Sequence, residues 1–427
     1  MMSLGKSLKP ESGKMKMINL VGALAGGNAV ATTIKMVSGI LTARLVEPAV
    51  LGLFNGIGLV MGYIPFMHLG VSNGLNRELP YYIGKNEKDR ANELAAAAQA
   101  WMLIIGLLAS MAIMAVAVVK LIYGEYWAAA GWGTHVFLAF LYFYGTCYLQ
   151  TTFRTSHDFA CLALINVIQA IVALIFLVLV WMMSFYGLCL RAILSILITT
   201  ALLYLWRPLR VAPRWNVKDL KHLLSVGTPI FVVGQVYAWW TVINQTLVLY
   251  YTGTHGMGLY TMVTMTTATA GLLPQAMVEV IYPRMAERFG NDNDVGSLFR
   301  MAMKPMLMCA AGMALLALAG WWMVGPLVKM VVPKYMDAVP AMQWSLLQPV
   351  VMCFAPLNNI FNVVRRQDMF LVAILAGMLA YGASLLFLTR DGAQLAVFPQ
   401  AMLVGYFVFI LASYVFLTHI KLKAQKA

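Results

Sequence analysis

The sequence predicts an all-α polytopic membrane protein. Of its 427 residues, 61% are hydrophobic and only 11% are charged, and the mean hydropathy is +0.78. Apolar stretches recur along the whole chain, and each approaches or exceeds the roughly 20 residues that a helix needs to cross a bilayer. We predict twelve membrane-spanning helices, over residues 18–43, 49–72, 95–121, 132–152, 160–182, 185–206, 223–250, 257–282, 303–325, 338–360, 369–389 and 395–420.

The basic residues follow an alternating pattern around these stretches. Of the thirty Lys and Arg residues, 23 lie at the chain ends or in every second gap, and Lys35 lies inside the first stretch. The remaining gaps contain only Arg44, Lys120, Arg191, Lys329, Lys334 and Arg390. By the positive-inside rule, both termini are expected in the cytoplasm. The net charge of +14 therefore matches anionic lipid headgroups, and no nucleic-acid partner is expected.

The chain divides near its middle at a basic connector that contains Pro208 and Pro213. We predict a cytoplasmic N-terminal segment (1–17), an N-terminal six-helix bundle (18–206), a cytoplasmic basic linker (207–222), a C-terminal six-helix bundle (223–420) and a cytoplasmic tail (421–427). Gly52-Leu53-Phe54 corresponds to Gly258-Leu259-Tyr260 at the start of the equivalent stretch. An even number of spans in each half makes this a parallel repeat, which is a transporter architecture.

The sequence gives little support for a catalytic or metal-binding function. The five cysteines are odd in number and all lie in apolar stretches, which favours neither disulfides nor a metal site. The sequence contains no phosphate-binding loop, HExxH, CxxC or GxSxG motif. We therefore predict a protein that is not an enzyme and has no cofactor.

Lys35 is the basic residue that lies most clearly within a predicted span. It shares one helical face with Asn28, Thr32 and Gly39, because their spacing follows the 3.6-residue period. One interpretation is a cationic substrate site facing an internal cavity, since intramembrane charges usually face a cavity or a partner. The other is a lysine whose ammonium group extends toward the outer headgroups.

Other polar residues within the predicted spans are mostly amides. Asn244, Gln245, Gln275 and Asn359 could bind a hydroxyl-rich ligand, or could form the interhelical hydrogen bonds that such residues make in bundles. Glu279 is the acidic residue within a span. It is either one member of an interfacial salt bridge or a carboxylate that couples transport to H+ or Na+ or latches a gate against Arg77 or Arg284.

Three groups of motifs carry a family resemblance. They are Arg44-Leu45-Val46-Glu47-Pro48 with Leu51-Gly52-Leu53-Phe54, then Gly70-Val71-Ser72-Asn73-Gly74-Leu75-Asn76-Arg77-Glu78-Leu79-Pro80, and Gly258-Leu259-Tyr260 through Leu273-Pro274 to Tyr282-Pro283-Arg284. In this order the motifs resemble those of Wzx-type polysaccharide flippases of the multidrug, oligosaccharidyl-lipid and polysaccharide exporter superfamily.

The resemblance implies a MATE-like fold, with two six-helix bundles around a central V-shaped cavity lined by the first, second, seventh and eighth spans. It implies an oligosaccharide on a polyprenyl (pyro)phosphate as substrate, moved between leaflets of the bacterial cytoplasmic (inner) membrane by alternating access. Arg77 and Arg284 would attract the phosphate at the cytoplasmic mouth, and Lys35 would bind it deeper. A monomer that works beside a polysaccharide polymerase or chain-length regulator is expected.

Two details bear on this expectation. The related peptidoglycan-precursor flippases have two additional C-terminal helices that this sequence lacks, which makes the peptidoglycan precursor a less favoured substrate.

The alternative function on the same fold is a cation-coupled drug or organic-cation antiporter. Such a pocket needs buried carboxylates, whereas the predicted spans offer Lys35 and the single Glu279.

Overall fold

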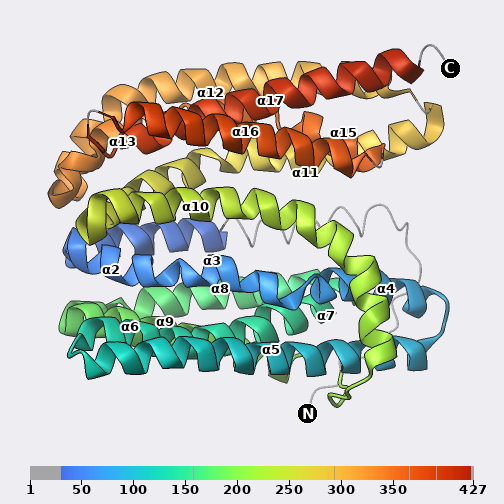
Figure 1. Ribbon diagram of the computed structural model, residues 1–427, viewed down its shortest axis with the longest axis horizontal. Helices are drawn as coiled ribbons and strands as arrows, with labels where there is room; N and C mark the ends of the chain where they lie inside the picture. The colour runs from blue at the N-terminus through green and yellow to red at the C-terminus, as the bar shows by residue number, and fades with distance from the viewer. Residues whose placement is uncertain (1–29, 157, 293, 365, 391, 425–427) are drawn as a thin grey trace.

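The protein consists of two groups of helices, and one long helix of the second group runs along the boundary between them. The computed structural model describes residues 30–156, 158–292, 294–364, 366–390 and 392–424. Figure 1 shows the N-terminal group and the C-terminal group as two stacks, with α10 running along the boundary and bending toward the N-terminal group at one end. The predicted Asn28, the N-terminal segment 1–17, residues 18–29 of the first predicted span and residues 425–427 of the predicted tail lie outside the described residues.

The N-terminal group begins with a helix over residues 30–45. Its remaining elements are α2 (Pro48–Gly58), α3 (Val60–Tyr63), η1 (Ile64–His68), α4 (Val71–Gly84), α5 (Lys88–Ile122), α6 (Tyr126–Leu141), η2 (Tyr142–Leu149), α7 (Gln150–Thr155), α8 (Phe159–Ile175) and α9 (Leu177–Leu205). The C-terminal group contains α10 (Val217–Ala270), α11 (Leu272–Asp292), α12 (Val295–Val331), η3 (Pro333–Ala338), α13 (Val339–Ser345), α14 (Gln348–Met352), α15 (Pro356–Val363), α16 (Gln367–Leu388) and α17 (Val397–Ala424).

The helices confirm an all-α polytopic membrane protein, whereas the predicted number of twelve spans stays a prediction. Among the described residues, seven helices are long and apolar enough to cross a membrane, or eight if one bent pair counts as a span. Two helix breaks fall in gaps that the sequence predicts between apolar stretches, although the helices run on across them. Gly253 interrupts α10 with a φ of 66°, and Ser184 interrupts α9 with a φ of 48°. A single helical stretch over Val217–Asn291 therefore contains two of the predicted spans.

Glycines let the two groups approach each other closely. A Cβ atom on Gly52 would lie 1.7 Å from the carbonyl oxygen of Thr254, and one on Gly258 would lie 1.8 Å from that of Pro48. The contact is reciprocal, because each glycine faces the residue four positions before the other. Gly70 makes a similar backbone contact with Gly227. Close helix packing is the usual consequence of small residues at such spacing.

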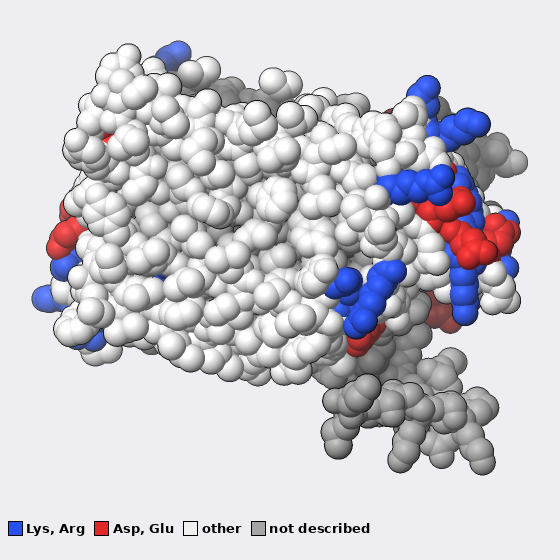
Figure 2. Space-filling view, turned by 90° about the horizontal axis from the view of Figure 1, so that it is seen from below, with Lys and Arg blue, Asp and Glu red and all other residues white. Residues whose placement is uncertain are grey.

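Charged side chains gather toward the two ends of the molecule. Figure 2 shows a broad uncharged middle and a concentration of Lys and Arg at one end, which we call the basic end. It holds the turn between α4 and α5 with Lys85 and Lys88, and the start of α10 with Lys218. The opposite end holds the turn between α5 and α6 and η3. A membrane belt over the uncharged middle agrees with this arrangement.

Different contacts join the two groups at each end. At the basic end, Arg90 pairs with Asp219 at 2.6 Å and His222 contacts Glu78 at 2.8 Å, which fastens the start of α10 to the N-terminal group. At the opposite end, Lys334 at η3 pairs with Glu47 at 2.6 Å. Residues 207–216 between α9 and α10 are not helical, so the linker connects the groups along the basic end.

Candidate functional site

Lys35 contacts α8 of the N-terminal group. It lies on the helix over residues 30–45, and its Nζ atom donates a hydrogen bond to Oε1 of Gln169 on α8 at 3.2 Å. Its side chain is exposed. The ammonium group has three N–H donors, so further donors are available to a ligand that reaches this side chain.

Arg191 lies beside Lys35, and its position corrects the sequence analysis. Arg191 was expected in a gap between spans, but it lies within α9, seven residues after the break at Ser184. Its Nη1 atom donates to Thr42 at 2.7 Å, and its Nη2 atom donates to Ser38 at 2.6 Å. Its Nε atom donates to the carbonyl of Ala173 at 2.8 Å.

These contacts form a cationic cluster, which we define as Lys35, Ser38, Thr42, Gln169 and Arg191. Among the described residues, neither basic member has an acidic partner within 4.0 Å. A basic residue at a helix centre costs about 2.5 to 3.5 kcal/mol on insertion scales. Two such charges with only neutral partners are costly to keep, and an anionic ligand would offset that cost.

A small polar cavity separates the two groups near their glycine contact. It has a volume of about 370 Å³ and is lined by residues of α2, α3 and α10, including Gln245 and Thr264. Across it, Asn55 donates to Thr261 at 2.8 Å and joins the two groups. Of the predicted amides, Gln245 is therefore placed where a polar ligand between the groups could reach it.

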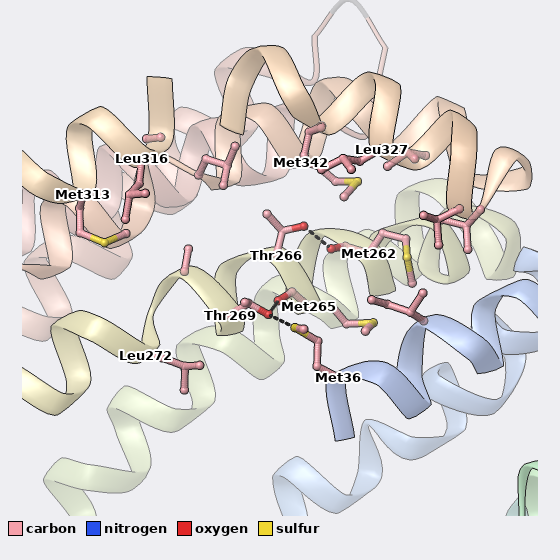
Figure 3. Close-up of a pocket in the computed structure, with 18 of the residues that line it drawn as sticks. Met36, Met262, Met265, Thr266, Thr269, Leu272, Met313, Leu316, Leu327 and Met342 are labelled. Atoms are coloured by element: carbon pink, nitrogen blue, oxygen red, sulfur yellow. Dashed lines mark hydrogen bonds between the residues drawn. The ribbon is translucent and has the colours of Figure 1, made fainter. Parts of the chain in front are cut away.

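A larger apolar cavity lies on the C-terminal side of the same first helix. Its volume is about 600 Å³. Figure 3 shows methionine and leucine side chains around it, drawn from the first helix, α10, α11, α12 and α13. The residues labelled there are Met36, Met262, Met265, Thr266, Thr269, Leu272, Met313, Leu316, Leu327 and Met342. Thr269 also donates to the sulfur of Met36 at 3.3 Å, which connects the two groups beside the cavity.

The first helix thus presents two chemical environments at adjacent positions. Lys35 contacts Gln169 in the N-terminal group, whereas Met36 lines the apolar cavity against the C-terminal group. Consecutive residues on a helix point about 100° apart because one turn has 3.6 residues. One helix therefore divides a cationic region from an apolar one.

The other predicted amides occupy different surroundings. Asn244 is buried, and it donates to Tyr260 at 2.8 Å and accepts from Tyr381 at 3.0 Å. This places it in the packing of the C-terminal group. Asn359 on α15 is half-buried, and its Nδ2 atom has no hydrogen-bond partner. The structure does not bring these two side chains together with Lys35 in one site.

The remaining predicted site residues are exposed on two helices. Arg77 lies on α4, whereas Gln275, Glu279 and Arg284 lie on α11. Glu279 forms no ion pair with Arg77 or Arg284 within 4.0 Å. Over the residues that the structure describes, no group of three or more potential metal ligands is present.

Sequence reasoning missed Arg191, Gln169, Asn55 and Thr261. Arg191 could have been found from its place within an apolar stretch, since the predicted span 185–206 contains it. The hydroxyl partners of Arg191 are 149 and 153 residues away in sequence, and no local pattern identifies contacts of that range.

Comparison with solved structures identifies the fold. The inward-facing conformation of a multidrug resistance MATE family transporter of the MOP superfamily is similar, with a TM-score of 0.79 and 13% identity over 93% of this chain and 96% of that chain. A MOP superfamily transporter from Pyrococcus furiosus, whose binding pocket is described as having reverse polarity, has a TM-score of 0.67 and 15% identity over 98% and 100% of the chains. The fold is therefore MATE-like.

The sequence itself identifies the family. Residues 40–324, more than half of the chain, match the sequence profile of the family described as polysaccharide biosynthesis protein. The chain belongs to this family. No curated protein matches the sequence. Family and fold together are those of a transporter, as predicted, rather than of an enzyme.

Proposed function

We propose that the protein is a flippase that moves an oligosaccharide repeat unit on a polyprenyl (pyro)phosphate from the cytoplasmic to the outer leaflet. Membership in the polysaccharide biosynthesis family implies a lipid-linked sugar as substrate. The fold is that of transporters, and alternating access between two bundles is the usual mechanism of such repeats.

The observation that carries the proposal is the division made by the first helix. Lys35 belongs to the cationic cluster, and Met36 lines the apolar cavity. A lipid-linked sugar has an anionic phosphate between an apolar tail and a polar head. A cation without an acidic partner suits the phosphate, and the small polar cavity with Gln245 suits sugar hydroxyls.

In this mechanism, Arg77 and Arg284 attract the phosphate at the basic end, and Lys35 holds it deeper. Gln245 and Gln275 contact the sugar, with Asn28, Asn244 and Asn359 as further candidates from the sequence. The tail stays in lipid or against the apolar wall. A proton or sodium gradient or the membrane potential supplies the energy, and Glu279 is the candidate coupling or gating carboxylate.

The proposed architecture has twelve spans in two six-helix bundles related by a parallel repeat. The reciprocal contact of Gly52 and Gly258 supports it, because a two-fold axis along the membrane normal would relate the two glycines. The domain limits remain those predicted above. We place the protein in the bacterial cytoplasmic membrane with both termini in the cytoplasm, as a monomer that works beside a polysaccharide polymerase or chain-length regulator.

The apolar cavity favours a second candidate, which is export of a drug or organic cation. A cavity of about 600 Å³ lined by five methionines would hold an adaptable apolar ligand. However, a cationic ligand would need a nearby carboxylate, and neither cavity has an acidic side chain in its lining. This difference makes the flippase the better-supported function.

Reconstituted vesicles test the proposal directly. A polyprenyl-diphosphate glycan is placed in the inner leaflet, and its arrival outside is followed with an external glycosidase. We expect the wild type to move the glycan and Lys35→Ala to lose most of this activity, whereas Lys35→Arg retains part of it. Lys120→Ala is the matched control, because Lys120 pairs with Glu125 away from both cavities. Equal rates with and without the protein would overturn the proposal.

A further inference from the structure

We infer that Pro229 is the hinge of the transport cycle, and that the first turns of α10, over residues 217–228, move with the N-terminal group. We call these turns the anchor segment. The inference rests on the proposed function, because alternating access requires the two groups to move against each other. It adds the position of the hinge and the boundary between the two moving bodies.

The anchor segment is attached to the N-terminal group by its polar side chains. Asp219 is 2% exposed, and it pairs with Arg90 of α5 at 2.6 Å. One turn later, His222 contacts Glu78 of α4 at 2.8 Å, and Glu78 is buried as well. Separating either contact would leave a buried carboxylate without its partner, which is costly.

Backbone contacts hold the same segment close to α4. A Cβ atom on Gly74 would lie 2.2 Å from the carbonyl oxygen of Leu223, and one on Gly70 would lie 2.7 Å from the carbonyl carbon of Gly227. The hydroxyl group of Thr228 donates at 2.7 Å to the carbonyl of the residue before Gly70. Helices that touch through backbone atoms have little room to slide, so the anchor segment stays with α4.

Beyond Pro229, α10 is embedded in the C-terminal group. Trp240 is 1% exposed, and its ring lies 5.0 Å from that of Tyr406 on α17. Asn244, one turn later, accepts a hydrogen bond from Tyr381 of α16 at 3.0 Å. The helix therefore changes partners along its length, from the N-terminal group to the C-terminal group.

Pro229 lies where the partners change, directly after the anchor segment. A proline inside a helix has no N–H for the carbonyl four residues earlier, which here belongs to Ser225. Prolines are a usual cause of sharp helix bends, and α10 bends toward the N-terminal group at its basic end (Figure 1). The missing hydrogen bond also lowers the resistance to further bending, and hinges need only a few such residues.

On the far side of the hinge, α10 and α2 meet through neutral groups. The side chain of Leu249 lies against Gly56. The hydroxyl groups of Tyr63 and Thr246 share a hydrogen bond of 2.7 Å. Separating these contacts leaves no unpaired charge. The opposite end of α10 can therefore leave the N-terminal group more easily than the anchor segment can.

Crosslinking tests which contacts separate during transport. The five cysteines are first replaced by alanine, and a short bismaleimide then joins engineered cysteine pairs. Glu78→Cys with His222→Cys crosslinks the anchor segment, whereas Glu47→Cys with Lys334→Cys crosslinks the opposite end. Relative to the same variants without crosslinker, glycan flipping in vesicles should stay within about twofold for the first pair and fall about tenfold or more for the second. Loss of flipping with the first crosslink, or full flipping with the second, would contradict the inference.

A labelling experiment tests the hinge without a glycan. A water-soluble maleimide should reach Leu249→Cys mainly when α10 separates from α2, and Tyr123→Cys, at a position 76% exposed at the same end, is the control. Pro229→Ala restores the hydrogen bond to Ser225 and favours a straighter α10, whereas α10 is bent in this form, in which the opposite end is closed. We expect Pro229→Ala to speed the reaction of Leu249→Cys by about fivefold and to leave that of Tyr123→Cys unchanged. An unchanged or slower reaction at Leu249→Cys would rule out Pro229 as the hinge.

A second proline variant separates a hinge from a fixed bend. Pro305 also lies inside a helix, but within α12 of the C-terminal group. Pro305→Ala should change neither the labelling rate nor the flipping rate. Pro229→Ala should lower flipping by about fivefold or more, because the cycle needs both forms of α10. Equal effects of the two variants would show that Pro229 is only a fixed bend.

Failure of this inference is distinguishable from failure of the proposed function. A protein that flips the glycan but stops when the anchor segment is crosslinked is a flippase with a different hinge. A protein whose labelling responds to Pro229→Ala but that flips no glycan retains the hinge and lacks the proposed function.

Discussion

The two sides of the first helix differ in chemistry. On one side, the cationic cluster holds two basic residues with neutral partners. On the other side, methionine, leucine and valine surround a cavity of about 600 Å³. The contrast indicates a site for an amphiphile, because a purely polar or purely apolar ligand would use only one of the two regions.

Reversing the charge at Lys35 is expected to have the largest effect on flipping. Lys35→Glu would place a carboxylate where the phosphate is proposed to bind. Placing like charges next to each other costs several kcal/mol, so vesicle flipping should fall by about 100-fold or more. Lys120→Glu on the surface should behave like the wild type. Undiminished flipping by Lys35→Glu would remove this residue from the mechanism.

Filling the apolar cavity tests whether the lipid tail contacts the other side of the first helix. Ala270→Phe would project a large side chain into the cavity that Ala270 lines, and overpacking costs about 1 to 3 kcal/mol. We expect the flipping rate of long-chain polyprenyl glycans to fall about tenfold. The flipping rate of an analogue with a short tail should fall less. Ala314→Phe on the exposed face of α12 is the matched control. Equal losses for both tail lengths would argue against contact between the tail and this cavity.

The pair between Glu47 and Lys334 gives the smallest expected effect. Both side chains are largely exposed, at 63% and 43%, and exposed pairs contribute about 0.2 to 1 kcal/mol. Lys334→Ala should therefore speed hydrogen exchange near residues 46–50 by at most about fivefold. If the pair acts as a unit, Glu47→Ala and the double variant should give the same increase. Additive increases would show that the two side chains act separately.

Much of the fold could be predicted from the sequence, because hydropathy and charge alternation are strong signals in membrane proteins. The polytopic all-α class and the resemblance to polysaccharide exporters are confirmed. The span count could not be settled in the same way. The breaks at Gly253 and Ser184 lie in predicted gaps, but the neighbouring helices join there without a loop, so helix length alone does not give the number of spans.

The candidate site was only partly predictable for a related reason. The polar stripe that contains Lys35 follows from helical spacing alone, and Gln245 lines a polar cavity. For its neighbour in sequence, Asn244, both a ligand contact and an interhelical hydrogen bond were expected alternatives, and its side chain binds Tyr260 and Tyr381 within the C-terminal group. Adjacent residues on a helix point in different directions, and which of them faces a cavity depends on partners far along the chain.

The glycine contact between the two groups has a consequence for how such a protein can diverge. Where Gly52 meets Thr254 and Gly258 meets Pro48, the two groups touch through backbone atoms. This contact imposes no requirement on the side chains at Lys35, Gln245 or the cavity methionines. Substitutions at those positions could therefore alter which sugar or lipid is accepted while the packing between the groups stays intact, and related chains could handle many surface glycans with one shared framework.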